Sequence, residues 1–154
     1  MSSPVRADPF VDGIAVLLHL LRNGLPAMRD GLATATVVED VPDLLAKHLP
    51  LVRIARTGGA STQPRFHSGF LVGLQVWSDS EPNPSWDPHR AAYELSQQVA
   101  KVLFLAREQQ TATPYGSISK WRESSGFRKF TDSALPHIGR YVATYDLLIR
   151  NIRP

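Results

Sequence analysis

The chain has 154 residues, of which 43% are hydrophobic and 20% are charged, and this size and composition predict a single globular domain spanning residues 1–154. Because it contains no cysteine, disulfides, thiolate metal sites and cysteine nucleophiles are excluded. The formal charge of +3 is too small an excess to identify a nucleic-acid-binding protein, and the longest apolar run, residues 14–21, is far shorter than the ~20 residues that cross a bilayer. We therefore expect a soluble protein with no secretory signal and no membrane partner, in which residues 1–8 form a flexible N-terminus.

The first expected element is a helix that begins at Asp8 and Pro9, an N-cap followed by the residue favoured at the first helical position. We expect Asn23 and Gly24 to end it, with Pro26 preventing its continuation. Its apolar residues surround most of the helix, so we expect neighbours on more than one side. Those at helical spacing are Val11, Ile14, Leu17, Leu18 and Leu21.

The next three segments predict short elements. Residues 34–38 are rich in Thr and Val and predict a short strand, whereas residues 41–48 predict a short helix that begins at Pro42. Residues 51–57 predict a second strand, which ends at the glycine pair 58–59 because glycine accepts positive φ at little steric cost.

A long polar loop is expected at residues 60–69, followed by a strand at residues 70–77. Loops of this length inside compact domains usually have a function. The strands on either side of it would form a hairpin from which the loop protrudes. One face of the second strand carries Phe70, Val72, Leu74 and Val76.

The clearest helix follows a turn-rich stretch at residues 78–88. Asp87 is its expected N-cap and Pro88 its first residue, and residues 111–116 end it. One apolar stripe indicates that it lies against a sheet. The stripe consists of Ala92, Leu95, Val99, Val102, Leu103 and Ala106.

Two more strands complete the predicted fold. Residues 117–123 alternate in polarity and predict a strand, Ser125 and Gly126 predict a turn, and residues 127–139 predict irregular structure. Residues 140–150 predict a terminal strand with one apolar face, whose free edge we expect near a subunit boundary. The expected class is α+β: two main helices on a mixed, mostly antiparallel sheet.

No motif in the chain indicates catalysis. The Ser-x-x-Lys match at Ser117 and Lys120 lacks the helical context and the companion motifs of hydrolases that use it. The histidines are scattered and no pair has the i, i+4 spacing of a zinc site. We therefore expect no enzymatic activity, no cofactor and no metal. The histidines are His19, His48, His67, His89 and His137.

Residues 120–130 interleave aromatic and basic side chains, and three interpretations remain open. The segment is typical of a surface that binds single-stranded nucleic acid. It is also typical of a strand whose aromatic residues face the core while its cations face water, or of a protein–protein contact, in which arginine and aromatic residues are enriched. The loop residues Arg65, Phe66 and His67 have the same character.

The order of these elements resembles the tail terminator family of long-tailed bacteriophages, to which the lambda tail terminator belongs. The resemblance covers roughly residues 40–152 and rests on the order and spacing of several segments. They are LVRIARTGG at 51–59, LVGLQVW at 71–77, the helix at 91–106, GSI at 116–118 and RYVATY within 140–150.

This resemblance implies a small domain with helices packed on a mixed sheet, and a homohexameric ring at the head-proximal end of the tail. Such a ring stops polymerisation of the tail tube protein and meets the head–tail connector or stopper protein, with genomic DNA only passing through its lumen. The protein would belong to the tail or neck of the virion, after assembly in the host cytoplasm. The alternatives are a head-closure or neck connector protein and a small nucleic-acid-binding module that uses residues 120–130. We expect subunit or partner contacts at Arg65, Phe66, His67, Arg122, Phe127, Arg128, Arg140 and Arg150.

Overall fold

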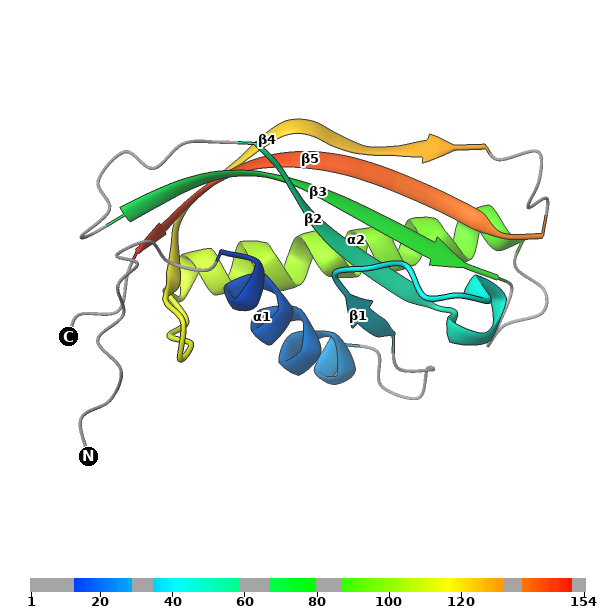
Figure 1. The fold of residues 1–154 in the computed structure, drawn as a ribbon, viewed down its shortest axis with the longest axis horizontal. Coiled ribbons are helices and arrows are strands. Elements are labelled where there is room, and N and C mark those ends of the chain that lie inside the picture. Colours follow the sequence, from blue (N-terminus) through cyan, green and yellow to red (C-terminus); the bar gives the residue numbers. More distant parts are fainter. Residues whose placement is uncertain (1–12, 29–34, 59–66, 80–86, 132–136, 151–154) are drawn as a thin grey trace.

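A computed structural model describes residues 13–28, 35–58, 67–79, 87–131 and 137–150. Two helices lie on one side of a single five-stranded sheet (Figure 1), and the expected α+β class is confirmed. In chain order the elements are α1 (Gly13–Met28), β1 (Thr36–Val38), the 3-10 helix η1 (Leu45–His48), β2 (Leu51–Gly58), β3 (His67–Ser78), α2 (Pro88–Glu108), β4 (Ser117–Phe130) and β5 (Gly139–Arg150).

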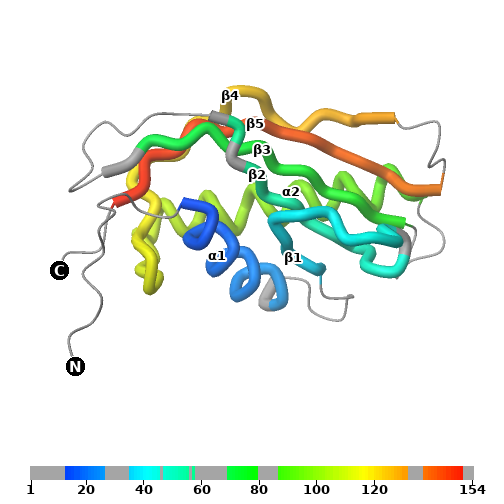
Figure 2. The backbone as a smooth tube through the Cα atoms, viewed as in Figure 1, coloured from blue at the N-terminus to red at the C-terminus, as the bar shows by residue number. Residues whose placement is uncertain are grey.

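The strand order is β1-β2-β3-β5-β4, in which β1 and β2 are parallel and every other pair is antiparallel. The expected hairpin partners β2 and β3 are neighbours. The expected free edge of β5 is wrong, because β5 lies between β3 and β4 (Figure 2). Within the described residues the outer strands are β1 and β4.

The expected end of the first helix is wrong, because α1 continues through Asn23, Gly24 and Pro26 to Met28. Glycine in a helix costs about 1 kcal/mol relative to alanine, whereas complete burial of a leucine contributes about 1.5–3 kcal/mol. Leu25 is fully buried and lies beyond the glycine, so packing outweighs the local signal. The Asp8 start lies outside the described residues.

Helix α1 is covered on more than one side, as its apolar surface predicted. It packs against α2, β1 and β2, and Phe70 of β3 lies against Gly13. Gly24 allows α1 to approach α2 closely, because a Cβ there would lie 2.6 Å from Cγ1 of Val102. The Arg22 guanidinium donates two hydrogen bonds, of 3.2 and 2.9 Å, to the carbonyl of Val37 and so joins the helix to β1.

Helix α2 agrees with its prediction in start, extent and buried face. The Asp87 carboxylate accepts a 2.9 Å hydrogen bond from the backbone N–H of Arg90, which is the expected N-cap. All six residues of the predicted apolar stripe are buried. They pack against the alternating apolar positions of β3 and β5 in one continuous core.

Strand β4 corrects the predicted turn at Ser125 and Gly126, because the strand runs without interruption from Ser117 to Phe130. Its register against β5 shifts at three places, between residues 118 and 120, 123 and 125, and 125 and 128. Each shift is a bulge, and a glycine inside a strand commonly marks one. The residues predicted as irregular therefore divide: those up to Phe130 extend β4, residues 132–136 lie outside the described structure, and Gly139 begins β5.

Shorter elements also differ from expectation. The helix predicted over residues 41–48 is only the turn η1, and the strand predicted over residues 34–38 is β1, whose described residues begin at Thr36. His67, predicted within the loop, is the first residue of β3. The remainder of that loop, residues 60–66, lies outside the described residues, so its protrusion stays a prediction.

Candidate interaction surfaces

The face of the sheet opposite the helices carries four of the predicted contact residues, the arginines at 122, 128, 140 and 150, because cross-strand partners share a face. We call it the open sheet face. No helix of the described structure other than the short η1 packs on it; Trp77 and Leu51 meet Leu45, Leu49 and Ile138 there in a small second core. Three cross-strand rows follow from the register: Leu51, Trp77, Arg140 and Phe130; Arg53, Gln75, Val142 and Arg128; and Leu71, Asp146 and Arg122.

Arg140 lies between two aromatic rings on the open sheet face. Its guanidinium carbon is 4.9 Å from the centre of the Trp77 ring and 4.4 Å from that of Phe130. It also donates a 3.2 Å hydrogen bond to Oε1 of Gln75. Such cation–π contacts each contribute about 0.5–2 kcal/mol, so Arg140 helps to hold β3, β5 and β4 together. Phe130 remains 45% exposed and is available to a partner.

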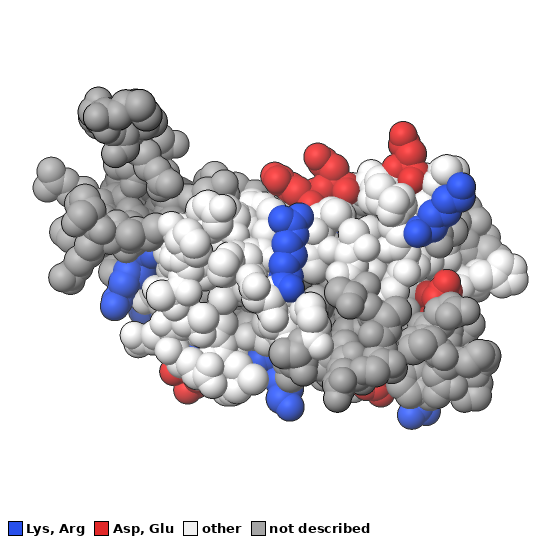
Figure 3. Space-filling model, turned by 90° about the horizontal axis from the view of Figure 1, so that it is seen from below, with Lys and Arg blue, Asp and Glu red and all other residues white. Residues whose placement is uncertain are grey.

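The cations of β4 line the outer strand of the sheet. Lys120, Arg122, Arg128 and Lys129 are all exposed, and only Glu123 on this strand opposes them. We call these four residues the basic strand. Arg122 forms a 3.0 Å ion pair with Asp146, but its side chain remains 79% exposed. On the helix side of the molecule the Lys and Arg side chains are not clustered as they are in the basic strand, and most of them are separated by uncharged residues (Figure 3).

Trp121 and Phe127 of β4 point toward the helices and the core, whereas Phe130 lies on the open sheet face beside Arg140. The Trp121 ring stacks on Tyr145 with centroids 4.0 Å apart and an interplanar angle of 18°, and Phe127 meets Tyr145 edge-on at 6.2 Å. Both are partly buried against the main core. This arrangement is the one expected of a strand with aromatics inward and cations outward, and it removes Trp121 and Phe127 from the surface that a nucleic acid base would need.

Tyr145 is the buried centre of this cluster, with 3% of its surface exposed. Its hydroxyl donates to Oε1 of Glu123 at 3.5 Å. Burial, the negative charge of Glu123 and this hydrogen bond raise the pKa of Tyr145 to about 12. Burial likewise raises the pKa of Tyr141, with smaller contributions from Tyr93 and Asp87. Tyr145 is therefore a structural phenol that keeps its proton at neutral pH.

The predicted contact residues do not converge on one site. Arg122, Arg128, Arg140 and Arg150 share the open sheet face, but Arg140 and Arg150 stand at opposite ends of β5, about 33 Å apart at ~3.3 Å per residue. His67 pairs with Arg150 at one end of the sheet. Arg65 and Phe66 lie outside the described residues, and Phe127 faces the helices.

Sequence reasoning missed the acidic counterpart of the basic strand. Glu39, Asp40 and Asp43 follow β1 and are all exposed. The Arg53 guanidinium lies beside these residues, but it donates its 3.1 Å hydrogen bond to the backbone carbonyl of Glu39 and not to a carboxylate. Within the described residues no cation forms an ion pair with any of these carboxylates. We call Glu39, Asp40 and Asp43 the acidic segment.

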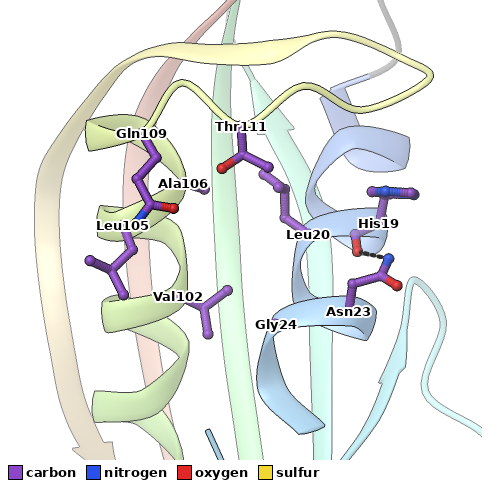
Figure 4. Close-up of a pocket in the computed structure, with 9 residues that line it drawn as sticks. All are labelled: His19, Leu20, Asn23, Gly24, Val102, Leu105, Ala106, Gln109 and Thr111. Atoms are coloured by element: carbon purple, nitrogen blue, oxygen red, sulfur yellow. Dashed lines mark hydrogen bonds between the residues drawn. The ribbon is translucent and has the colours of Figure 1, made fainter. Parts of the chain in front are cut away.

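A hollow of about 330 Å³ lies between α1 and α2 (Figure 4). Val102 points from α2 toward Gly24 of α1, Leu20 extends from α1 toward Thr111, and Asn23 donates a 2.7 Å hydrogen bond to the carbonyl of His19. Its lining is mainly apolar and contains no constellation of groups for acid–base chemistry. The lining residues are His19, Leu20, Asn23, Gly24, Val102, Leu105, Ala106, Gln109 and Thr111.

The described residues contain no group of three or more His, Asp or Glu side chains placed to hold a metal ion. Ser117 and Lys120 lie in β4, and not at the start of a helix as in the hydrolases with a Ser-x-x-Lys motif. Neither α1 nor α2, the two long helices of the described chain, has the length and apolarity needed to cross a membrane.

No family model matches this chain, but it is similar to a phage protein. The gene 22 protein of Mycobacterium phage D29 is 30% identical over 110 residues. These residues cover 69% of this chain and 74% of the phage protein. The similarity therefore extends over most of both chains.

Proposed function

The chain belongs to the family of the gene 22 protein of Mycobacterium phage D29, and from this membership we propose that it is a structural protein of a phage virion, specifically a tail terminator. Six copies would form a ring at the head-proximal end of the tail. One side of that ring would stop polymerisation of the tail tube protein, and the other would meet the head–tail connector or stopper protein. The proposal includes no catalysis and no cofactor.

Two observations together support this function best. The chain has a homologue in a phage, and its fold is the one that the tail terminator resemblance implies. Two helices pack on one face of a mixed sheet, and the other face is open. Such an asymmetric domain offers different surfaces to different partners, which a subunit between tail tube and connector requires. A head-closure or neck protein would need the same property, and it remains the second candidate within this class.

The nucleic-acid-binding module is supported by one observation, the exposed cations of the basic strand. Trp121 and Phe127 are turned toward Tyr145, and Phe130 is the aromatic residue of β4 that stays exposed, so phosphate contacts would dominate binding to this strand. Such binding would weaken steeply with salt and would have little preference for single strands. A virion role requires no such affinity, and DNA binding measured across a salt series separates the two hypotheses.

Polymerisation of the tail tube protein tests the terminator function directly. Purified tube protein is allowed to elongate with and without this chain, and tube lengths are measured by electron microscopy. A tail terminator stops elongation and appears as a ring at one tube end. If tubes reach the same length in both samples but the protein binds purified portal–connector complexes, the head-closure function replaces the terminator function. If it does neither and is absent from virions, the virion proposal is wrong.

A further inference from the structure

The basic strand and the acidic segment lie at opposite edges of the same sheet. The strand order places β1 and β4 at its two ends, separated by β2, β3 and β5 (Figure 1). At ~4.8 Å between neighbouring strands, the two edges are about 19 Å apart. Charges at this distance on one chain are screened from each other in physiological salt, since the Debye length is about 8 Å. The two surfaces therefore cannot neutralise each other within one subunit.

The two edges are complementary in charge. The basic strand has four cations against the carboxylate of Glu123, and the ion pair of Arg122 with Asp146 of β5 lowers the local charge from +3 to +2. Residues 39–48 hold three carboxylates against Lys47, a local charge of −2. All of these side chains are exposed, and within the described residues the single ion pair among them joins Arg122 to Asp146. Each edge thus retains unneutralised charge of the sign that the other edge lacks.

Each edge also presents apolar side chains beside its charges. Val41 and Leu44 are 42% and 68% exposed next to the acidic segment, and Phe130 is 45% exposed at the end of β4. Leu44 has a left-handed backbone conformation, with φ 57° and ψ 59°, which is unfavourable for a leucine. Backbone strain persists mainly at functional positions, and apolar centres with charged rims are typical of protein interfaces.

We infer that the acidic segment of one copy of this chain docks on the basic strand of the next copy, with Leu44 placed beside Phe130. The contact uses two different surfaces, so it is head-to-tail, and repetition of such a contact closes into a ring when the rotation per subunit is suitable. It rests on the proposed ring function and supplies the subunit contact that the ring needs.

The geometry of β4 indicates that side chains and not backbone hydrogen bonds form this contact. Three bulges interrupt the register of β4, and lysine and arginine project from it. Natural edge strands use both features to prevent the addition of another strand. The contact should therefore be sensitive to salt, because it depends on exposed ion pairs.

Site-directed cross-linking tests this contact even when the assembly is transient, and the absence of native cysteine makes each introduced thiol unique. Asp40→Cys and Arg128→Cys are prepared as separate proteins, mixed, and treated with a short bismaleimide. The mixture should give a covalent dimer in much higher yield than either variant alone. A mixture of Glu108→Cys with Arg128→Cys is the matched control, because Glu108 is equally exposed but lies at the end of α2.

Charge reversal gives an independent measurement. Glu39→Lys with Asp40→Lys makes both edges basic, and Lys120→Glu with Arg128→Glu makes β4 acidic. Each double variant should self-associate roughly tenfold more weakly than the wild type, because several exposed ion pairs are replaced by repulsion. Mixing the two double variants should restore association in sedimentation velocity experiments, since each now offers what the other lacks.

Three results would overturn the inference. The first is a cross-linking yield for positions 40 and 128 no higher than that of the Glu108 control. The second is an equally efficient dimer of Asp40→Cys alone, which indicates a symmetric contact. The third is suppression of the cross-link by duplex DNA together with DNA binding that the Lys120→Glu, Arg128→Glu variant loses, which identifies the basic strand as a phosphate-binding surface.

Failure of the contact and failure of the function are distinguishable. If the cross-link forms but tube elongation continues, the subunit contact stands and the terminator function is wrong. If elongation stops but positions 40 and 128 do not cross-link in the tube-bound ring, the function stands and the inferred contact is wrong.

Discussion

Substitution of Trp121 by alanine separates a structural role for the aromatic residues of β4 from a role in binding nucleic acid. Trp121 stacks on the buried Tyr145 at 4.0 Å and packs against the main core. Removal of a fully buried aromatic side chain costs about 3–5 kcal/mol, and a stacked pair adds about 0.5–1.5 kcal/mol to burial. Because Trp121 is only partly buried, we expect Trp121→Ala to lose about 2–3 kcal/mol of unfolding free energy.

In a domain of this size, 1 kcal/mol corresponds to about 2–4 °C, so the melting temperature should fall by about 4–12 °C. Urea denaturation followed by far-ultraviolet circular dichroism measures the loss without using tryptophan fluorescence. Arg122→Ala is the matched control on the next residue, because an exposed ion pair contributes at most about 1 kcal/mol. Trp121→Phe should recover part of the loss, because a smaller ring can still stack.

The reasoning is refuted if Trp121→Ala is as stable as the wild type while Arg122→Ala is not. A Trp121→Ala variant of unchanged stability that loses affinity for single-stranded DNA would instead favour the nucleic-acid-binding module.

Three further substitutions follow from individual contacts. Gly139→Ala should destabilise the protein by about 1–3 kcal/mol, because the new Cβ would meet the backbone carbonyl of Pro88. Gly73→Ala should change stability by less than about 1 kcal/mol, because the nearest neighbour of its Cβ is a methyl group at 3.3 Å. Equal melting temperatures of the two variants would contradict this reasoning. The pKa of Tyr145 is raised to about 12 from 10.0, so the folded state binds the phenol proton more tightly than the unfolded state. The stability that this provides, about 1–2 kcal/mol, is complete below pH 10 and lost as the pH rises from 10 to 12, and Tyr145→Phe should flatten that part of a stability–pH profile. Asp87→Ala removes the N-cap of α2 and should lower the free energy of unfolding, measured by thermal unfolding, by about 1 kcal/mol. Asp87→Asn should retain most of the wild-type stability, because its side-chain oxygen can still accept the hydrogen bond. Identical losses in both variants would show that the charge matters and not the hydrogen bond.

Local signals predicted α2 well because all of them agreed. Asp87, Pro88 and the apolar stripe each indicate the same helix, and the sheet that covers the stripe only reinforces it. In α1 the signals disagreed. Gly24 and Pro26 indicated an end, but burial of Leu25 depends on a contact with distant residues that no local pattern contains.

The contact residues were harder to predict because their direction depends on the register of β4. Strict alternation fails where a bulge adds a residue, and two of the three bulges of β4 lie between Trp121 and Phe130. Arg140 lies on the open sheet face and its role as a contact residue stays a prediction; its position between Trp77 and Phe130 requires three strands that are distant in sequence to be aligned. The acidic segment could not be recognised as a possible partner of the basic strand until β1 and β4 were known to be the two edge strands of the sheet.

The position of β5 between β3 and β4 has a consequence for how the chain folds during synthesis. Both neighbours of β5 precede it in sequence, so β4 has no partner strand until residues 139–150 have left the ribosome. Until then the nascent chain can form only the three-stranded sheet β1-β2-β3, with the long edge of β3 unpaired. Such an edge invites pairing with other chains, and contacts between distant residues slow the completion of folding. A nascent chain stalled before Gly139 should therefore aggregate, and insertion of β5 is the step that ends this exposure.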